Sequence, residues 1–253
     1  MTDLPKTDSK EPSVVFITMH KAGSVLVNQV LEELLLEAGM PHIDFARYAF
    51  DSGIKEGDYC VSKAHLLSTP GYYFGAFRGP YLDKFDDLSK NRLIIQVRDP
   101  RDCIVSLYFS YKYSHSKPGN GILKSIFNST RKKTRNTDVN KFAMENIGNY
   151  DYRMKIISAT LDRYQNHLLI TYEQMVQDFD AWLNTIIKYL ALDPGEECLD
   201  KIRNLANFEV LVENVAVHKR QVTPGDYQRK LDPVVQQTMT EMLQIHLQRY
   251  GYV

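Results

Sequence analysis

Short apolar runs alternate along the chain with longer segments of helical periodicity. Four runs are too short for helices and rich in branched residues, which indicates β-strands: Val14–Thr18, Tyr59–Ser62, Leu93–Val97 and Leu168–Thr171. The longer segments repeat apolar residues every three or four positions, which indicates helices: Ser24–Ala38, Asp102–Tyr111, Glu173–Leu190 and Pro233–Arg249. This alternation predicts an α/β fold with a central parallel sheet flanked by helices. Ligands of such sheets bind at the carboxyl ends of the strands.

Length and composition narrow the class of protein. A chain of 253 residues suits a single domain, expected over 13–253, after a polar and disordered leader at 1–12. The leader lacks the apolar core of a signal peptide, and no long apolar run predicts a membrane span. The formal charge is zero, with 31 basic and 31 acidic residues, so no global field favours nucleic acid or a membrane surface. The three cysteines lack metal-ligand spacing, and we expect a cytoplasmic protein without a metal.

The least regular interior stretch covers residues 114–141. It is rich in glycine, polar groups and positive charge. A loop of this length in a compact domain is usually a lid, a binding loop or a mobile segment, and the pattern predicts a mobile loop.

The turn between the first predicted strand and helix has the composition of an anion site. Lys21, Gly23 and Ser24 stand directly before or at the start of the helix. A helix start offers unpaired N–H groups and the positive end of its dipole, and glycine lets the chain approach a phosphate closely. The pattern is not that of the nucleoside-triphosphatase loop, because the lysine precedes the glycine. An ordinary turn with Ser24 as helix cap is the structural alternative.

A second strand end carries a matching feature. The run Leu93–Val97 ends in Arg98, a turn follows at Pro100, and the next helix carries Ser106. An arginine fork and a serine hydroxyl that converge suit a phosphate monoester. In the alternative interpretation Arg98 pairs with Asp99 or Asp102 and has only a structural role.

Together the two segments resemble the sulfotransferases that use 3′-phosphoadenosine-5′-phosphosulfate (PAPS) as donor. In that family a P-loop-like strand–loop–helix cradles the 5′-phosphosulfate, and an Arg-Asp-Pro-Lys/Arg-Asp motif with a following serine holds the 3′-phosphate. The second motif is present from Arg98 to Ser106. The resemblance implies that the donor contacts these residues of the loop: Lys21, Ala22, Gly23, Ser24, Val25 and Leu26. Hydroxyl residues are usual at the positions of Ala22 and Val25, which implies that the loop relies more on its backbone N–H groups. Many members have tryptophan at the position of Leu26, which implies a weaker or differently packed adenine pocket.

The resemblance extends to further segments and implies roles for them. Cys60–Leu66 is similar to a strand of the family that ends in Lys-x-His-Leu, which implies His65 as general base beside Lys63. Tyr172 and Phe208 match positions that contact the adenine. His218–Leu231 resembles the family's terminal segment, which implies that Arg220, with Lys219 as an alternative or partner, binds the 3′-phosphate. The resemblance covers nearly the whole chain.

The implied reaction is sulfuryl transfer from PAPS to a hydroxyl or amine of a small-molecule acceptor, with adenosine 3′,5′-bisphosphate (PAP) as product. Lysines and helix N–H groups supply the positive field, so no metal is expected. Aromatic segments are the candidate acceptor lining: Ile43–Asp51, Tyr72–Phe77 and Tyr108–His115. They favour a compact, partly polar ring in the acceptor. The compact chain without the family's adenine tryptophan favours an acceptor of specialised metabolism, with phenols, alcohols, lipids and a polar alkaloid as candidates. A small-molecule or nucleotide kinase, a carbohydrate sulfotransferase and an inactive binding module remain alternatives, and the oligomeric state is open.

Overall fold

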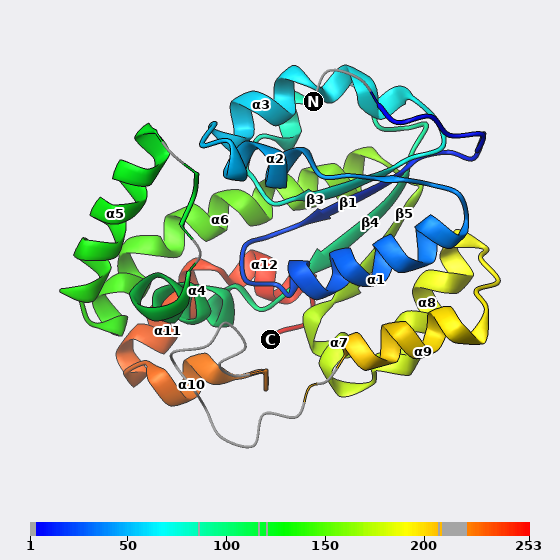
Figure 1. Cartoon of the computed structure of the whole chain (residues 1–253). Coiled ribbons are helices and arrows are strands. Elements are labelled where there is room, and N and C mark those ends of the chain that lie inside the picture. Colours follow the sequence, from blue (N-terminus) through cyan, green and yellow to red (C-terminus); the bar gives the residue numbers. More distant parts are fainter. Residues whose placement is uncertain (1–3, 86, 116, 120, 207, 209–221) are drawn as a thin grey trace.

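The computed structural model describes residues 4–85, 87–115, 117–119, 121–206, 208 and 222–253 (Figure 1). Its centre is a parallel sheet with strand order β2-β3-β1-β4-β5. The strands are β1 (Val14–Thr18), β2 (His42–Ile43), β3 (Tyr73–Phe77), β4 (Arg92–Val97) and β5 (His167–Thr171). Because β1 lies between β3 and β4, the loop after β1 has neighbours on both sides at the carboxyl edge of the sheet.

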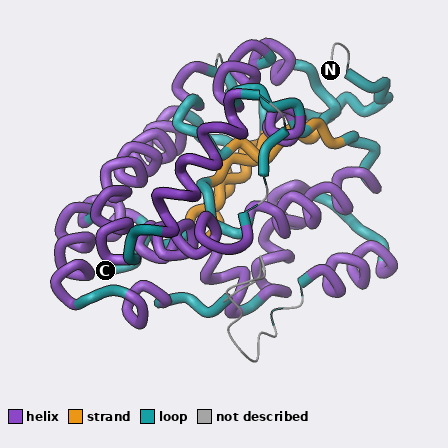
Figure 2. Tube along the Cα trace, turned by 60° about the vertical axis from the view of Figure 1, so that its left-hand side comes forward, coloured by secondary structure: helices purple, strands orange, loops and turns teal. Residues whose placement is uncertain are grey.

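Both faces of the sheet are buried. Val14 and Phe16 of β1 pack in one apolar cluster, whereas Val15 and Ile17 pack in another. In Figure 2 the strands accordingly lie inside a shell of helices. The first cluster includes residues of α1 (Ser24–Glu37), α8 (Phe179–Leu190) and α9 (Glu196–Leu205). The second includes residues of α2 (Phe45–Asp51), α4 (Pro100–Phe109), α6 (Val139–Arg163), α10 (Asp226–Lys230), α11 (Pro233–Met242) and α12 (Gln244–Arg249).

Three of the four predicted strands are confirmed, as β1, β4 and β5. The strand predicted at Tyr59–Ser62 is wrong, because these residues belong to helix α3 (Glu56–Ser62). Glu56 and Asp58 in its first turn stabilise the helix through its dipole. The strand that pairs with β1 on the side opposite to β4 is β3. Its aromatic sequence was interpreted only as acceptor lining.

Two predicted helices are each divided in two. Glu173–Leu190 becomes α7 (Tyr172–Gln177) and α8, because the Asp178 carboxylate caps α8 by accepting from Ala181 N–H at 3.0 Å. Pro233–Arg249 is divided into α11 and α12 at Leu243.

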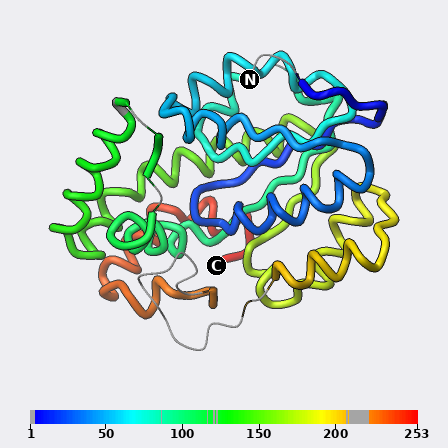
Figure 3. The backbone as a smooth tube through the Cα atoms, viewed as in Figure 1, coloured from blue at the N-terminus to red at the C-terminus, as the bar shows by residue number. Residues whose placement is uncertain are grey.

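Of two segments expected to be irregular, one contains helices and the other contacts the domain without forming a helix or strand. Residues 114–141 contain helix α5 (Ile122–Arg135) and the start of α6. In Figure 3 this green segment lies at the end of the view opposite to the yellow α8 and α9. The described part of the leader, 4–12, lies against the domain, where the Tyr72 hydroxyl donates to Pro5 O at 2.7 Å and Arg92 pairs with Glu11 at 2.8 Å. Across the described ranges, no helix is long and apolar enough to cross a bilayer.

The division between α7 and α8 yields a stability test. Asp178→Ala removes the side-chain acceptor at the start of α8, and we expect the free energy of unfolding to fall by about 0.5–2 kcal/mol. Chemical denaturation followed by circular dichroism measures it. Gln177→Ala, an exposed change one residue earlier, is the control and should cost about 0.5 kcal/mol or less. Equal losses in both variants would contradict the capping role.

Candidate active site

The loop between β1 and α1 has a backbone conformation suited to an anion. Lys21 and Gly23 both lie in the left-handed region, with φ of 71° and 79°. Gly23 is the N-cap of α1 and offers no side-chain acceptor, so the first N–H groups of the helix keep no cap. A Cβ on Gly23 would lie 3.0 Å from both Met175 Cε and Tyr172 Cδ2, so the close packing also requires glycine here.

Arg98 connects this loop with its neighbours. Its side chain is buried, and its Nη1 donates to Lys21 O at 2.9 Å. The guanidinium lies 4.0 Å above the ring of Tyr172, and Nη2 is 3.7 Å from Asp102 Oδ2. Nε is buried and has no hydrogen-bond partner among the described residues. A buried donor without an acceptor is costly, which marks this position as one that a ligand oxygen would satisfy.

The alternative in which Arg98 pairs with a carboxylate of its own motif is met only in part. Its contact to Asp102 is longer than a hydrogen bond, and Asp99 instead binds Arg101, whose Nη2 is 2.7 Å from Asp99 Oδ2. Ser106 lies two turns into α4 and is half-buried. The arginine and the serine thus share the strand–turn–helix that the sequence predicted.

Asp102 fixes a segment from the other end of the chain to α4. Its two oxygens accept from Gly225 N–H at 2.8 Å and Tyr227 N–H at 2.9 Å. Burial raises the pKa of this carboxyl group, while Arg98 and the two backbone donors oppose the rise. The Tyr172 hydroxyl donates to Val222 O at 2.9 Å and so holds the same segment near Arg98.

Of three further residues predicted to contact the nucleotide, the structure describes one. Phe208 is half-buried, 5.8 Å from Phe179 in an edge-on arrangement. Lys219 and Arg220 lie outside the described residues, so their predicted role stays a prediction.

A cation that sequence reasoning missed lies on the other side of the loop. Arg78 follows β3, and its Nε donates to Ser24 Oγ at 3.0 Å. Arg153 of α6 donates from Nη1 to Arg78 O at 2.6 Å and thereby holds the backbone of this turn. An arginine directly after an apolar run was the available signal, but β3 was not identified as a strand. Neither arginine has a carboxylate within ion-pair distance among the described residues.

The predicted placement of Lys63 and His65 is wrong. The two residues follow helix α3, and His65 lies in the single-turn helix Ala64–Ser68, where it is exposed. Leu67 O and Thr69 O accept from Asn91 and Ser13, which precede β4 and β1. This segment therefore lies at the amino edge of the sheet, whereas the loop of Lys21 lies at the carboxyl edge. The premise that made His65 a general base is not met.

The predicted acceptor lining divides into core and rim. Phe45 and Phe74 stack at 5.9 Å in the core, and the Tyr73 hydroxyl donates to Asn28 of α1. The half-buried Tyr111 and His115, by contrast, lie against Phe127 of α5 at 6.1 and 5.5 Å. The aromatic rim is thus built by the π-helical turn Ser110–Ser114 and its neighbour α5.

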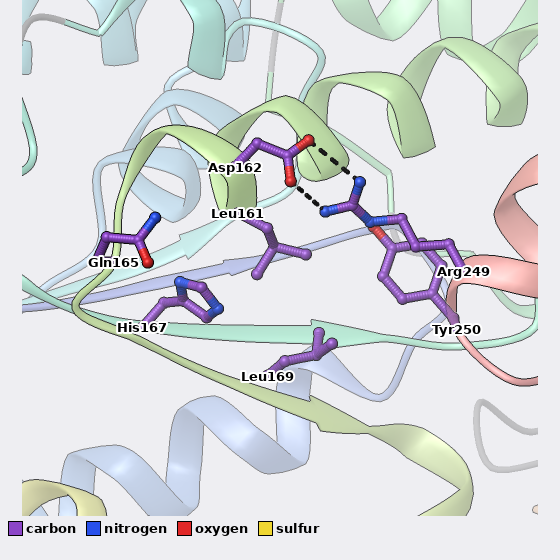
Figure 4. A pocket seen from close by; sticks show the side chains of 7 residues that line it. All are labelled: Leu161, Asp162, Gln165, His167, Leu169, Arg249 and Tyr250. Carbon is purple, nitrogen blue, oxygen red and sulfur yellow. Dashed lines mark hydrogen bonds and ion pairs between the residues drawn. The ribbon is translucent and has the colours of Figure 1, made fainter.

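A depression of about 440 Å³ lies elsewhere (Figure 4). The ion pair of Asp162 and Arg249, at 2.6 Å, closes one side of it, and His167 from the start of β5 lies on another. This position belongs to the amino edge of the sheet and not to the anion loop. In the described ranges, no three His, Cys, Asp or Glu side chains are grouped as metal ligands.

The anchoring by Asp102 can be tested without a ligand. Asp102→Ala removes the acceptor of two backbone donors, and we expect the amides of Gly225 and Tyr227 to lose hydrogen-exchange protection by about tenfold or more, because each bond to a carboxylate contributes about 1.5–3 kcal/mol. Mass-resolved exchange of the peptides that contain these amides measures this. Asp200→Ala, on exposed α9, is the control and should leave them protected. Unchanged protection in Asp102→Ala would contradict the anchoring.

Comparison with known proteins gives consistent matches. A family model described as the sulfotransferase domain matches residues 85–248. Sulfotransferase 1C2 of Rattus norvegicus is 21% identical over 237 residues, which are 89% of this chain and 74% of the rat protein.

Solved structures share the fold. The crystal structure of mouse sulfotransferase SULT7A1 complexed with PAP superposes with a TM-score of 0.65 at 17% identity, over 95% of this chain and 86% of the mouse chain. Retinol dehydratase in a complex with retinol and PAP gives a TM-score of 0.51 at 16% identity, over 94% and 82% of the two chains.

Proposed function

The chain belongs to the sulfotransferase domain family, and we propose that it transfers the sulfuryl group of PAPS to a hydroxyl or amine of a small-molecule acceptor. The observation that carries this proposal is Arg98, whose Nη1 binds the loop before α1 and whose buried Nε has no partner among the described residues. The PAP in the two related structures supports the same donor class.

The described residues fit the two phosphates of such a nucleotide separately. Arg98 and Ser106 would bind the 3′-phosphate, since the guanidinium is fixed by Lys21 O and Tyr172 and still has a free donor. The N–H groups at the start of α1, with Gly23 and Ser24, would bind the 5′-phosphosulfate. The other residues that the resemblance assigns to the donor site would also contact the nucleotide: Ala22, Val25, Leu26, Tyr172, Phe208, Lys219 and Arg220.

Catalysis in this proposal depends on positive charge fixed in advance. PAPS, when bound, supplies an activated sulfuryl group. Lys21 and the α1 N–H groups stabilise the negative charge that develops on the 5′-phosphate side of the scissile bond. Arg78, held on Ser24 Oγ, takes the part that the sequence had assigned to Lys63, a second cation near the transferred group.

The acceptor class rests on the rim of the site. The half-buried rings of Tyr111 and His115, packed on the buried Phe127, would contact a compact, partly polar molecule, which suits an acceptor of specialised metabolism. The retinol bound by retinol dehydratase is a small hydroxyl-bearing molecule, and it supports an acceptor of that size.

Nucleotide binding separates the proposal from the kinase alternative. We expect calorimetry to detect PAP binding and to detect none for ATP with or without Mg²⁺, because the site matches a 3′-phosphate and lacks a triphosphatase loop. Tight binding of ATP together with no binding of PAP would reject the sulfotransferase proposal in favour of a kinase.

Arg98→Ala tests the residue that carries the proposal. Loss of a charge-assisted pair should weaken PAP binding by about 10- to 150-fold, the equivalent of 1.5–3 kcal/mol. Arg163→Ala, an exposed arginine at the end of α6, is the control and should bind as the wild type does. Circular dichroism verifies folding of both variants. An unchanged affinity in a folded Arg98→Ala protein would remove this residue from the site.

Lys21→Ala should act on the rate more than on binding. We expect single-turnover consumption of PAPS to slow by about 10²-fold or more, because the ammonium stabilises charge that grows in the transition state. The affinity for PAP should fall much less, since Ser24 and the helix start remain. Lys21→Arg should restore little, because a broad fork replaces a compact ammonium at a left-handed position. A loss confined to PAP affinity would show that Lys21 only binds the nucleotide.

A further inference from the structure

His20 lies in the loop between β1 and α1, which has a different neighbouring strand on each side. The loop follows β1, and on one side of it β4 and β5 are followed directly by Arg98 and Tyr172. On the other side β3 is followed directly by Arg78. The charged and titratable groups close enough to act on the His20 ring are Arg153 on α6, Arg78 after β3, His115 after the π-helical turn, and Lys21. Helix α6 bonds both to the His20 carbonyl group, through Tyr150, and to the turn at Arg78, through Arg153. These contacts favour the Arg78 side of the loop for the imidazole.

The position of His20 is fixed while its ring stays available. Its carbonyl oxygen accepts from the Tyr150 hydroxyl of α6 at 3.1 Å. The ring is half-buried and makes no hydrogen bond to any residue that the structure describes. A ring nitrogen next to Lys21 is thus open to a ligand, and the backbone that carries it is held.

The surroundings of His20 favour its neutral form. Partial burial lowers the pKa of His20 well below 6.5, and the positive charges of Arg153, Arg78, His115 and Lys21 add to this effect. A group with a lowered pKa is unprotonated at pH 7, so the imidazole has a lone pair to accept a proton.

The other histidines of the described residues are differently placed. His42 binds Gly75 O, His115 binds Ser110 Oγ, and His246 binds Asp151. His65 and His167 lie in segments at the amino edge of the sheet. Among the described histidines, only His20 combines an open ring with a place beside Lys21.

We propose that His20 is the general base of the sulfuryl transfer, on the acceptor side of the loop. This rests on the proposed function. The acceptor O–H proton passes to an imidazole nitrogen of His20 while the acceptor oxygen forms its bond to sulfur. The bond from sulfur to the bridging oxygen breaks, and its electron pair stays on the 5′-phosphate of PAP beside Lys21. The imidazolium then returns its proton to solvent.

NMR titration of the imidazoles tests the placement without turnover. The His20 signals, assigned by their loss in His20→Asn, should titrate below pH 6.5 in the free protein. PAP should raise this pKa, because its negative charge lies near the ring and favours the imidazolium. A His20 signal that titrates at or above 6.5 in the free protein, or is unaffected by bound PAP, overturns the proposal.

Kinetics test the chemical role. With PAPS and water as acceptor, single-turnover PAP release by the wild type should decrease below the pKa that NMR gives for the PAP complex. In His20→Asn the rate should fall by about 10²-fold and should no longer depend on pH in this range. The affinity of this variant for PAP should stay within about threefold of the wild-type value. The matched control His65→Asn, at the exposed histidine of the amino edge of the sheet, should keep both the rate and the dependence.

The two proposals fail in distinguishable ways. Absence of PAP binding in the wild type rejects the proposed function and this inference with it. Normal PAP binding with an unchanged rate in His20→Asn, or with the loss in His65→Asn instead, rejects His20 as base and leaves the donor site intact.

Discussion

The buried guanidinium of Arg98 is the contact on which the arrangement of the site depends. A buried charge is costly unless hydrogen bonds and nearby opposite charge compensate it. Arg98 obtains this compensation from three segments: Lys21 O in the loop after β1, the ring of Tyr172 after β5, and Asp102 on α4. These contacts join the ends of the three strands β1, β4 and β5. They leave one donor, Nε, without a partner in the part of the chain that the structure describes.

The same contacts explain how the loop after β1 keeps its conformation. A left-handed φ at a lysine costs about 1–2 kcal/mol. The bond from Arg98 to Lys21 O and the one from Gln96 to Ala22 O, at 2.5 Å, hold the two carbonyl groups in the loop. On the far side Tyr150 and Arg153 of α6 donate to His20 O and Arg78 O, so that one helix holds both the loop and the turn after β3.

The sequence predicted the parts of the site that are local along the chain. β1 with α1, and β4 with α4, are each a strand, a turn and a helix in succession, so the sequence placed Lys21, Gly23, Arg98 and Ser106 on the right elements, and their binding roles stay predictions. His65 was misplaced because Lys-x-His-Leu is a short motif, and the helix in front of it has too few residues to reveal its period. Arg78 was missed because its role depends on β3 pairing with β1, a contact between distant segments.

The helical boundaries show the same limit. Asp178 ends one helix and caps the next within a continuous apolar pattern. Periodicity alone therefore merged α7 with α8. Helix α5 in residues 114–141 was missed because most of its residues are polar or basic, and such a composition is also typical of a loop.

A crystal structure of the complex with PAP tests the central claim most directly. The account predicts the 3′-phosphate within hydrogen-bond distance of Arg98 and Ser106 and the 5′-phosphate at the start of α1 beside Lys21. It also predicts the His20 ring on the side of the 5′-phosphate away from the adenine. A nucleotide bound at another edge of the sheet, or a 3′-phosphate that leaves Arg98 Nε unpaired, would contradict it.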